Sequence, residues 1–483
     1  MKDSALFRGL LVGTLIIVLG IGFAGLGCKK GAEEVSAPSD ITIEEGKVPE
    51  EVEITEEGEV PEAVVAADEF GEQVVYVSEG GTGAGTRDDP MGVINKAIDH
   101  AQSTWPEKPS SVLVAEGTYQ VLSGSTHVWI SEGVSIYGGF SKDWMKRDPS
   151  VYITSIKDTS TSGGSWDSPN RAVEAGSSVT DATVIDGFKI EGSGGGATIV
   201  SAIFNHDGAK LTISNNMING GSGSLASMAI FNFKNSPVTI KNNTIDGGNG
   251  SAHSLGVYSR ENSAAKIHSN AINGGKGKYS NGIENSSGSS SIIFNNTIDA
   301  GDGIDVCHGI ANLSSSPKIY NNTINGGGCS GWSHGIYNAK GTASFIGSSP
   351  LIANNIIFTS AGSDGYGIYE NGTTDDAAEV KYNDFFNCPT ALYHDHDQGK
   401  DFTAICPGGN FGILACGDTL NSPVGEGNVA MDPKFVGPND WHLTNLSPTT
   451  VTKGGLDLSA EFNTDKDGDP REAPWSMGAY EYD

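Results

Sequence analysis

Residues 238–248 read VTIKNNTIDGG: a short alternating strand, an asparagine pair, a second short strand and a glycine pair. Similar units occupy 211–221, 265–275, 291–301 and 317–327. The second asparagine of the pair recurs at steps of 27, 27, 26, 26, 33 and 28 residues. It falls at Asn216, Asn243, Asn270, Asn296, Asn322, Asn355 and Asn383. Self-similarity at such a period indicates a repeat protein whose units stack on one another.

A second marker keeps the same period, because a small residue followed by Ile or Val recurs, for example at Gly256-Val257 and Gly309-Ile310. Each repeat has room for three short strands with period-2 alternation and for no helical crossover. The sequence therefore predicts an all-β fold, a right-handed parallel β-helix with three short strands per coil of 26–27 residues. We predict that the recurring asparagine points into the coil and forms a structural ladder of hydrogen bonds.

Both ends of such a stack need covering, because an open coil exposes strand edges. Apolar residues between Pro90 and Gln102 are spaced as one face of a helix, which predicts an N-terminal helical cap. We assign residues 74–440 to the β-helix with this cap and residues 441–483 to a C-terminal capping segment.

The start of the chain resembles a bacterial lipoprotein signal. Residues 1–27 begin with basic side chains, continue with an apolar stretch and end in small residues before Cys28, which would carry the lipid. The alternative is an uncleaved membrane anchor, since about 20 apolar residues span a bilayer. Both interpretations place the body outside the cytoplasm, and Lys29 favours an outer membrane if the cell is Gram-negative.

Charge separates the next segment from the rest of the chain. Residues 31–73 carry 15 acidic side chains and one lysine, which predicts that 28–73 is a disordered acidic tether. The whole chain has 29 Lys and Arg against 59 Asp and Glu, a formal charge of −30. This balance argues against nucleic acid as a partner, because a phosphate backbone requires clustered basic side chains.

Several stretches outside the repeat resemble one protein family. They are VAEGTY (114–119), YGGFS (137–141), DPKFV (432–436), DGDPR (467–471) and GAYEY (478–482). Together they are similar to bacterial surface lipoproteins of the right-handed parallel β-helix repeat family, within the pectate-lyase-like superfamily. The resemblance implies the fold. It leaves the activity open, because such families include polysaccharide-degrading enzymes, adhesins and members of unassigned role.

Five cysteines follow Cys28. Cys307 and Cys329 lie 22 residues apart, nearly one coil, which predicts a disulfide between adjacent coils. Cys406 and Cys416 flank a glycine-rich loop and are predicted to close it. Cys388 is then unpaired, although pairing of Cys388 with either of these two is an equally allowed alternative.

The candidate catalytic group lies on two adjacent coils. Parallel β-helix lyases use Ca²⁺ held by carboxylates with a basic residue, and the hydrolases use paired aspartates. Asp302, Asp305, His308 and His334 match this chemistry best, because residues one coil apart should stack at about 5 Å. The alternative interpretation makes the aspartates turn residues and gives the histidines an ordinary strand position.

Two further clusters are candidate metal ligands. His394 and His396 alternate along a strand, so their imidazoles would share one side and could hold a transition metal. Asp465, Asp467 and Asp469 follow the early part of a calcium loop, which makes Ca²⁺ the candidate cofactor. A plain Asp-Gly turn is the simpler interpretation of the second cluster.

Aromatic residues among polar neighbours complete the functional signal. Tyr366 and the tryptophans can stack on sugar rings, and one of them, Trp332, lies near His334. The other candidates are Trp144, Trp166 and Trp441. We predict a non-catalytic cell-surface lipoprotein that binds a glycan or another surface component, held to the membrane by its lipid. The alternatives are a polysaccharide lyase or glycoside hydrolase acting on an acidic polysaccharide, and a structural envelope component.

Overall fold

The computed structural model describes residues 66–482, apart from 181, 342–346, 361–363 and 414–415. The signal segment, Cys28 and nearly all of the tether lie outside the described residues. Within the described part of the chain, no helix is both long and apolar enough to cross a bilayer.

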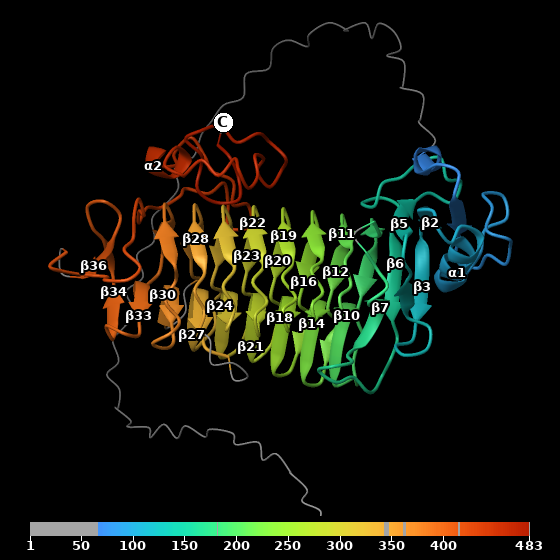
Figure 1. Ribbon diagram of the computed structural model, residues 1–483, viewed down its shortest axis with the longest axis horizontal. Helices are drawn as coiled ribbons and strands as arrows, with labels where there is room; N and C mark the ends of the chain where they lie inside the picture. Colours follow the sequence, from blue (N-terminus) through green and yellow to red (C-terminus); the bar gives the residue numbers. More distant parts are fainter. Residues whose placement is uncertain (1–65, 181, 342–346, 361–363, 414–415, 483) are drawn as a thin grey trace, which may run out of the picture. The chain divides into compact units, whose positions relative to one another are not determined.

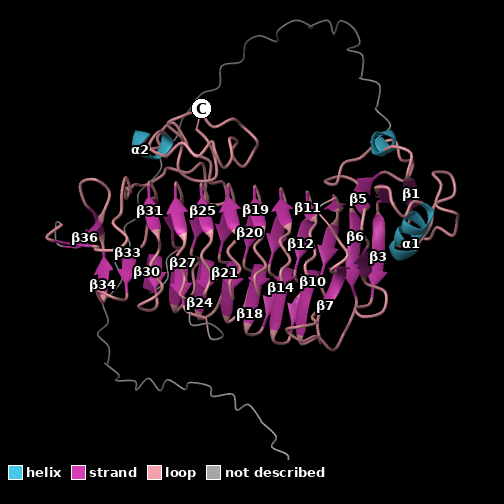
Figure 2. Cartoon of the chain, in the orientation of Figure 1, coloured by secondary structure: helices cyan, strands magenta, loops and turns pink. Residues whose placement is uncertain are grey.

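Three long sheets run side by side along the described chain, and successive coils add one strand to each (Figures 1 and 2). In the described residues, sheet A has 11 strands: β1 (Val74–Val77), β2 (Ser110–Ala115), β5 (Val134–Phe140), β8 (Val184–Asp186), β11 (Thr212–Ser214), β15 (Thr239–Lys241), β19 (Lys266–His268), β22 (Ile292–Phe294), β25 (Lys318–Tyr320), β28 (Leu351–Ala353) and β31 (Glu379–Lys381).

Sheets B and C complete each coil. Over the same described residues, sheet B has 10 strands: β3 (Gly117–Val121), β6 (Thr154–Asp158), β9 (Lys189–Glu191), β12 (Met217–Asn219), β16 (Thr244–Asp246), β20 (Ala271–Asn273), β23 (Thr297–Asp299), β26 (Thr323–Asn325), β29 (Ile356–Phe358) and β32 (Asp384–Phe386). Sheet C has 11 described strands: β4 (Val128–Ile130), β7 (Asn170–Ala175), β10 (Ile199–His206), β14 (Ala226–Phe233), β18 (His253–Arg260), β21 (Tyr279–Ser286), β24 (Val306–Leu313), β27 (Trp332–Ala339), β30 (Asp364–Glu370), β33 (Ala391–Asp395) and β34 (Lys400–Phe402). A small extra pair joins β13 (Ser222–Gly223) to β17 (Asn249–Gly250).

The core is a set of apolar columns inside the coil. Ile213, Ile240 and Ile267 lie in register on neighbouring strands of sheet A and are fully buried, and Ile230 and Val257 repeat the arrangement in sheet C. Coils that pair in parallel repeat every ~4.8 Å, so the same inward position in each coil meets its copy above and below. These parallel pairings confirm the predicted parallel β-helix.

The recurring asparagine lies inside the coil with its side chain fully hydrogen-bonded. The side-chain oxygen of Asn270 accepts from the backbone N–H (2.9 Å) and the side-chain amide (3.0 Å) of Asn243. The amide of Asn270 donates to the oxygen of Asn296 and to the backbone oxygen of Ile240. The pattern repeats from Asn216 to Asn383 and then continues to Asn428, beyond the recognisable repeat.

A second ladder lines the inner side of sheet C. The side-chain amide of Asn205 donates to Asn232, and Asn285, Asn312 and Asn338 continue the series at 3.0–3.1 Å. Ser259 interrupts this series and accepts from the amide of Asn232, and within each run the stacked amides supply hydrogen-bond partners to one another from coil to coil.

Each end of the solenoid is closed by a different device. At the N-terminal end, α1 (Ile94–Thr104) follows the short helix at Ala66–Phe70 and β1, and it buries Ile94, Ala97, Ile98 and Ala101, as the spacing predicts. At the other end, β34 pairs antiparallel with β33. There β35 (Ala404–Ile405), β36 (Phe411–Ile413) and β37 (Asp418–Thr419) form an antiparallel sheet.

The segment after residue 432 lies along the side of the solenoid and not across its last coil (Figure 1). Leu456, Leu458 and Phe462 pack on Phe294 and Tyr320 of sheet A. Its short helix α2 (Thr449–Thr452) contributes Val451 to a second apolar cluster that contains Ile356 of sheet B. The chain end is therefore a lateral cover, because its apolar residues match the flank of the coils.

Polar contacts fix this cover in place. The first residues of three asparagine pairs, Asn295, Asn321 and Asn354, donate to backbone oxygens of the segment. The guanidinium of Arg471 is buried, donates to Asn295 and pairs with Glu481 at 2.9 Å.

The described cysteines follow the predicted pairing. Disulfides join Cys307 to Cys329 and Cys406 to Cys416, which confirms both predictions, and Cys388 is the free cysteine of the described chain. Burial raises the pKa of the Cys388 thiol, so it is held as the neutral thiol. Two structural disulfides are typical of an extracytoplasmic protein.

Candidate functional site

The outer side of sheet C carries two rows of side chains in register from coil to coil. One row contains Phe231, Tyr258, Glu284, Ala311, Tyr337, Tyr369 and His394. The other contains Met228, Leu255, Asn281, His308, His334 and Tyr366. Two buried residues separate the rows on each strand, such as Gly256 and Val257, and both face the core, since a Cβ at Gly256 would meet the buried side chain of Ile272. We call these two rows the aromatic face.

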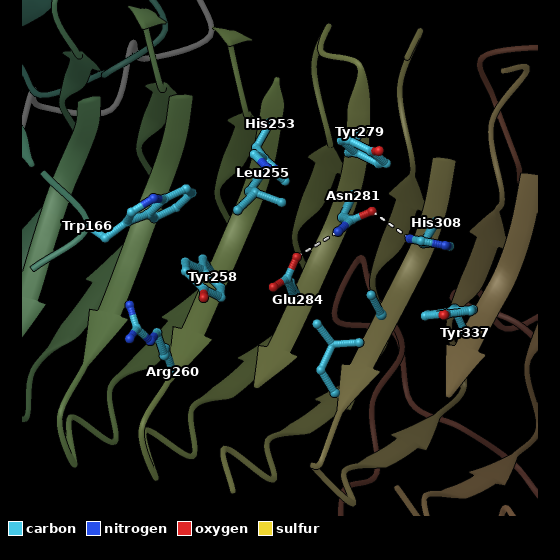
Figure 3. Close-up of a pocket in the computed structure, with 12 residues that line it drawn as sticks. Trp166, His253, Leu255, Tyr258, Arg260, Tyr279, Asn281, Glu284, His308 and Tyr337 are labelled. Atoms are coloured by element: carbon cyan, nitrogen blue, oxygen red, sulfur yellow. Dashed lines mark hydrogen bonds between the residues drawn. The ribbon is translucent and has the colours of Figure 1, made fainter. Parts of the chain in front are cut away.

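A pocket of about 380 Å³ opens on the aromatic face over β18, β21 and β24. Its aromatic walls include Trp166, Tyr258, Tyr279 and Tyr337, and Figure 3 shows Trp166 at one end and Tyr337 at the other. Trp166 comes from the loop before β7, and its ring lies edge-on to His253 and Tyr258 at 5.8 and 6.4 Å. The pocket is therefore formed by sheet C together with Trp166, which comes from a loop distant in the sequence.

A short chain of hydrogen bonds crosses the pocket floor (Figure 3). The side-chain amide of Asn281 donates to Glu284 Oε2 at 2.8 Å, and Asn281 Oδ1 lies 2.8 Å from His308 Nδ1. Burial lowers the pKa of His308 to about 3, so this imidazole is neutral and its Nδ1–H donates to Asn281. Burial raises the pKa of Glu284 to about 7, while Asn281 and Arg260 act in the opposite direction.

Arg260 is the single basic side chain other than histidine among the described residues that line the pocket. Its guanidinium lies 3.2 Å from Glu261 and 3.8 Å from Asp167, and it packs over the ring of Phe233. Burial also lowers the pKa of His253. At neutral pH the pocket thus contains one compensated cation and one carboxyl group that titrates close to that pH.

This arrangement suits a ligand with apolar faces and a polar edge. Rings can stack on the aromatic walls, while Asn281 and Glu284 offer an amide and a carboxyl group for hydrogen bonds. Glu284 is also the one carboxyl group among the described lining residues, and its pKa lies in the range useful for proton transfer.

The predicted catalytic residues do not assemble as one group. His308 and His334 stack with ring centroids 5.0 Å apart, as expected for adjacent coils. Asp302 and Asp305 instead lie in the turn before β24 and pair with Lys276 and Lys278 at 3.5 and 3.3 Å. These carboxylates are exposed, whereas His308 and His334 are buried, and a catalytic role for the four residues stays a prediction.

The predicted glycan contacts lie beside the pocket. Trp332 is 55% exposed, and its ring centroid is 6.4 Å from that of His334. Tyr366 lies 5.4 Å from the same imidazole, on the next strand. Of the other tryptophans, Trp144 is buried against Tyr76 and is not a surface residue, because a tight turn returns it to the sheet.

The candidate metal ligands are occupied by other contacts. His394 Nδ1 lies 2.7 Å from Asp401 and its ring stacks on Tyr369, while His396 lies exposed beyond the end of β33. Asp465 accepts three backbone N–H groups of its own turn, including those of Asp467 and Asp469. In the described residues no three His, Cys, Asp or Glu side chains converge on a cation position, and both metal sites stay predictions.

Glu284 and Asn281 were missed as functional residues, although a signal for them exists. Glu284 follows Ile283, which keeps the period of the buried Gly-Ile marker, so alternation places its side chain outside. Register then sets it beside Tyr258 of the preceding coil. A second cluster was also missed: Glu174 accepts from Arg171 at 2.5 Å and from His206 at 2.9 Å, next to Trp129.

Residues 77–306, a little under half of the chain, match a family model described as a protein of unknown function (DUF1565). No curated protein matches the sequence. Solved structures similar to the chain include pectate lyase Pel9A, with a TM-score of 0.48, 11% identity and coverage of 85% of this chain and 96% of that one. The A-module of mannuronan C-5 epimerase AlgE6 from Azotobacter vinelandii has a TM-score of 0.39 and 15% identity, with coverage of 73% of this chain and 98% of that one. The catalytic domain of a GH87 alpha-1,3-glucanase has a TM-score of 0.37 and 12% identity, with coverage of 69% of this chain and 63% of that one.

Proposed function

We propose that this protein binds a glycan chain on the aromatic face and does not cleave it. The observation that carries the proposal is the pocket, where Trp166, Tyr258 and Tyr279 surround the hydrogen-bonded pair of Asn281 and Glu284. A sugar ring has an apolar face and a rim of hydroxyl groups, so it matches aromatic walls around a polar floor.

The aromatic face continues beyond the pocket and gives a chain of sugars further contacts. Tyr337 stacks between His308 and Tyr369 at centroid distances of 4.5 and 6.0 Å, and Tyr369 stacks on His394. Trp332 stands exposed beside this row. A row of rings that stack on one another on rigid strands is ordered before binding, which lowers the entropy lost on association.

A second candidate function is polysaccharide cleavage, and Glu284 is the observation that favours it. A carboxyl group with a pKa of about 7 can act as a general acid or base near neutral pH. Glycoside hydrolysis generally requires two carboxyl groups, and the described lining residues supply one. The lyase form of the hypothesis requires a free basic group, whereas Arg260 is paired. Binding is therefore the better supported function.

The site is proposed to act outside the cytoplasm. Two disulfides indicate that location, and we propose that Cys28 carries a lipid that holds the protein at the cell surface. A structural envelope component with no sugar affinity is the contrasting hypothesis, and the binding experiment separates the two.

The experiment measures binding of the full chain to a panel of neutral and acidic polysaccharides, with reducing ends and unsaturated products assayed in parallel. Tyr279→Ala should weaken binding about tenfold, because a ring contact contributes up to about 1.5 kcal/mol. Tyr152→Ala is the matched control, since Tyr152 precedes β6 on sheet B. Product release that is lost in Glu284→Gln would establish cleavage, and absence of binding across the panel would refute the proposal.

A further inference from the structure

We propose that the glycan bound on the aromatic face is uncharged, and that acidic polysaccharides are excluded from it. This inference rests on the proposed function and names the ligand class of the same site. It follows from how the basic and acidic side chains of sheet C are arranged, and it runs against the expectation of an acidic substrate.

Basic side chains are scarce on sheet C, and each is already compensated. Its described strands contain two arginines and one lysine. Arg171 lies 2.5 Å from Glu174, Arg260 lies 3.2 Å from Glu261, and Lys400 lies 2.6 Å from Asp418. A carboxylate ligand would therefore share each cation with an internal carboxylate, which lowers the gain from a charge-assisted hydrogen bond.

The turns that border the pocket repeat this pattern. Lys276 and Lys278 precede Tyr279, and their ammonium groups lie 3.5 and 3.3 Å from Asp302 and Asp305 of the next coil. Lys278 also lies over the ring of Tyr279, 5.7 Å from its centroid. The carboxylates of Asp302 and Asp305 thus pair with two lysines that border the pocket.

The pocket floor favours hydroxyl groups over carboxylates. Glu284 offers a carboxyl group that donates to a hydroxyl when protonated and accepts from one when ionised. Its ionised form repels a second carboxylate in a partly desolvated site. Asn281 and the neutral imidazole of His308 add dipoles and no charge.

Long-range electrostatics act in the same direction. The chain carries a formal charge of −30, so a polyanion approaches against a repulsive field that salt screens over ~10 Å at 0.1 M. An uncharged chain meets no such barrier, and its binding depends on ring stacking and hydrogen bonds alone.

The test compares polymers that differ only in charge. Polygalacturonate and mannuronan are each paired with their carboxyl-reduced forms, in which every carboxylate has become a primary alcohol, and binding to the full chain is measured at 20 and 300 mM NaCl. At least one reduced polymer is expected to bind about tenfold or more tightly than its acidic parent at low salt. Salt should narrow this gap by improving only the binding of the acidic form.

Two variants test which side chains exclude acidic polysaccharides from the aromatic face. Glu284→Gln removes the floor charge, and the double variant Asp167→Asn with Glu261→Gln releases Arg260 from its carboxylates. The double variant is expected to raise the affinity for the acidic polymer several-fold and to leave the reduced polymer within twofold. Glu284→Gln also changes a hydrogen-bonding group of the pocket floor, so for this variant the expected result is a several-fold rise in the ratio of acidic-polymer affinity to reduced-polymer affinity. Lys189→Gln on sheet B is the matched control and should change neither.

The outcomes separate the two proposals. Acidic polymers that bind as tightly as their reduced forms would overturn the exclusion and leave glycan binding intact. If no polymer of either pair binds and the wider panel is also negative, both proposals fail together.

Discussion

Glu284 gives the sharpest prediction, because its environment sets both a pKa and a pH-dependent stability. Burial raises the pKa of this carboxyl from 4.5 to about 7 in the folded chain. The folded state therefore binds its proton more tightly than the unfolded state, and the stability it contributes is present below pH 4.5 and lost as pH rises to 7. This rise in pKa from 4.5 to about 7 corresponds to roughly 3 kcal/mol of stability.

The experiment replaces Glu284 by Gln and follows urea unfolding from pH 4.5 to 8.5. Since glutamine keeps the shape and never ionises, the variant should match the wild type near pH 4.5 and exceed it by up to about 3 kcal/mol at pH 8. Glu261→Gln serves as the control, because that exposed carboxylate pairs with Arg260, and its effect should not grow with pH. A Glu284→Gln difference that stays flat across this range would refute the assigned environment of Glu284.

Three further predictions concern the scaffold. Asn270→Ala should destabilise the fold by about 3 to 5 kcal/mol in urea unfolding, because it leaves at least two buried backbone groups without partners. The control Asn273→Ala, on the surface of the same coil, should cost about 1 kcal/mol. Arg471→Met should release the C-terminal segment to limited proteolysis while the circular dichroism of the sheets is retained, and an intact chain after digestion would contradict this. Glu174 and Asp207 raise the pKa of His206, so the stability due to that imidazolium is present below pH 6.5 and lost as pH rises. His206→Gln should therefore be more damaging at pH 6 than at pH 9 by thermal unfolding.

The fold was predictable because its signal is local and repeated. The second asparagine of each pair keeps its period, and its amide satisfies the backbone of the adjoining coils, so spacing alone predicts position. The ladder's extension to Asn428 was not predictable, because Asn428 lies 45 positions after Asn383, beyond the β33–β34 hairpin and the small antiparallel sheet, where the repeat spacing is lost. The inner ladder of Asn285 and Asn312 keeps the period, yet without a neighbouring glycine pair it resembles an ordinary surface position.

Some residues of the candidate site were likewise predictable from the sequence, and others were not. Alternation from the buried Ile283 is sufficient to turn Glu284 outward, and register sets it beside Tyr258. Sequence proximity, by contrast, did not indicate that Asp302 is exposed and paired with Lys276 while His308 is buried, because a turn can direct side chains only a few residues apart to different surroundings.

By itself the sequence determined the repeat, the coil and the pairs of residues that stack on neighbouring strands, since these follow from hydrogen bonds between units of equal length. Only the tertiary structure decided which face became a site. Trp166 reaches the pocket from a loop some ninety residues before Tyr258, and the chain end covers one flank of the solenoid while leaving sheet C open. Such contacts depend on packing between segments that share no period, and their free energy arises only when the coils are stacked.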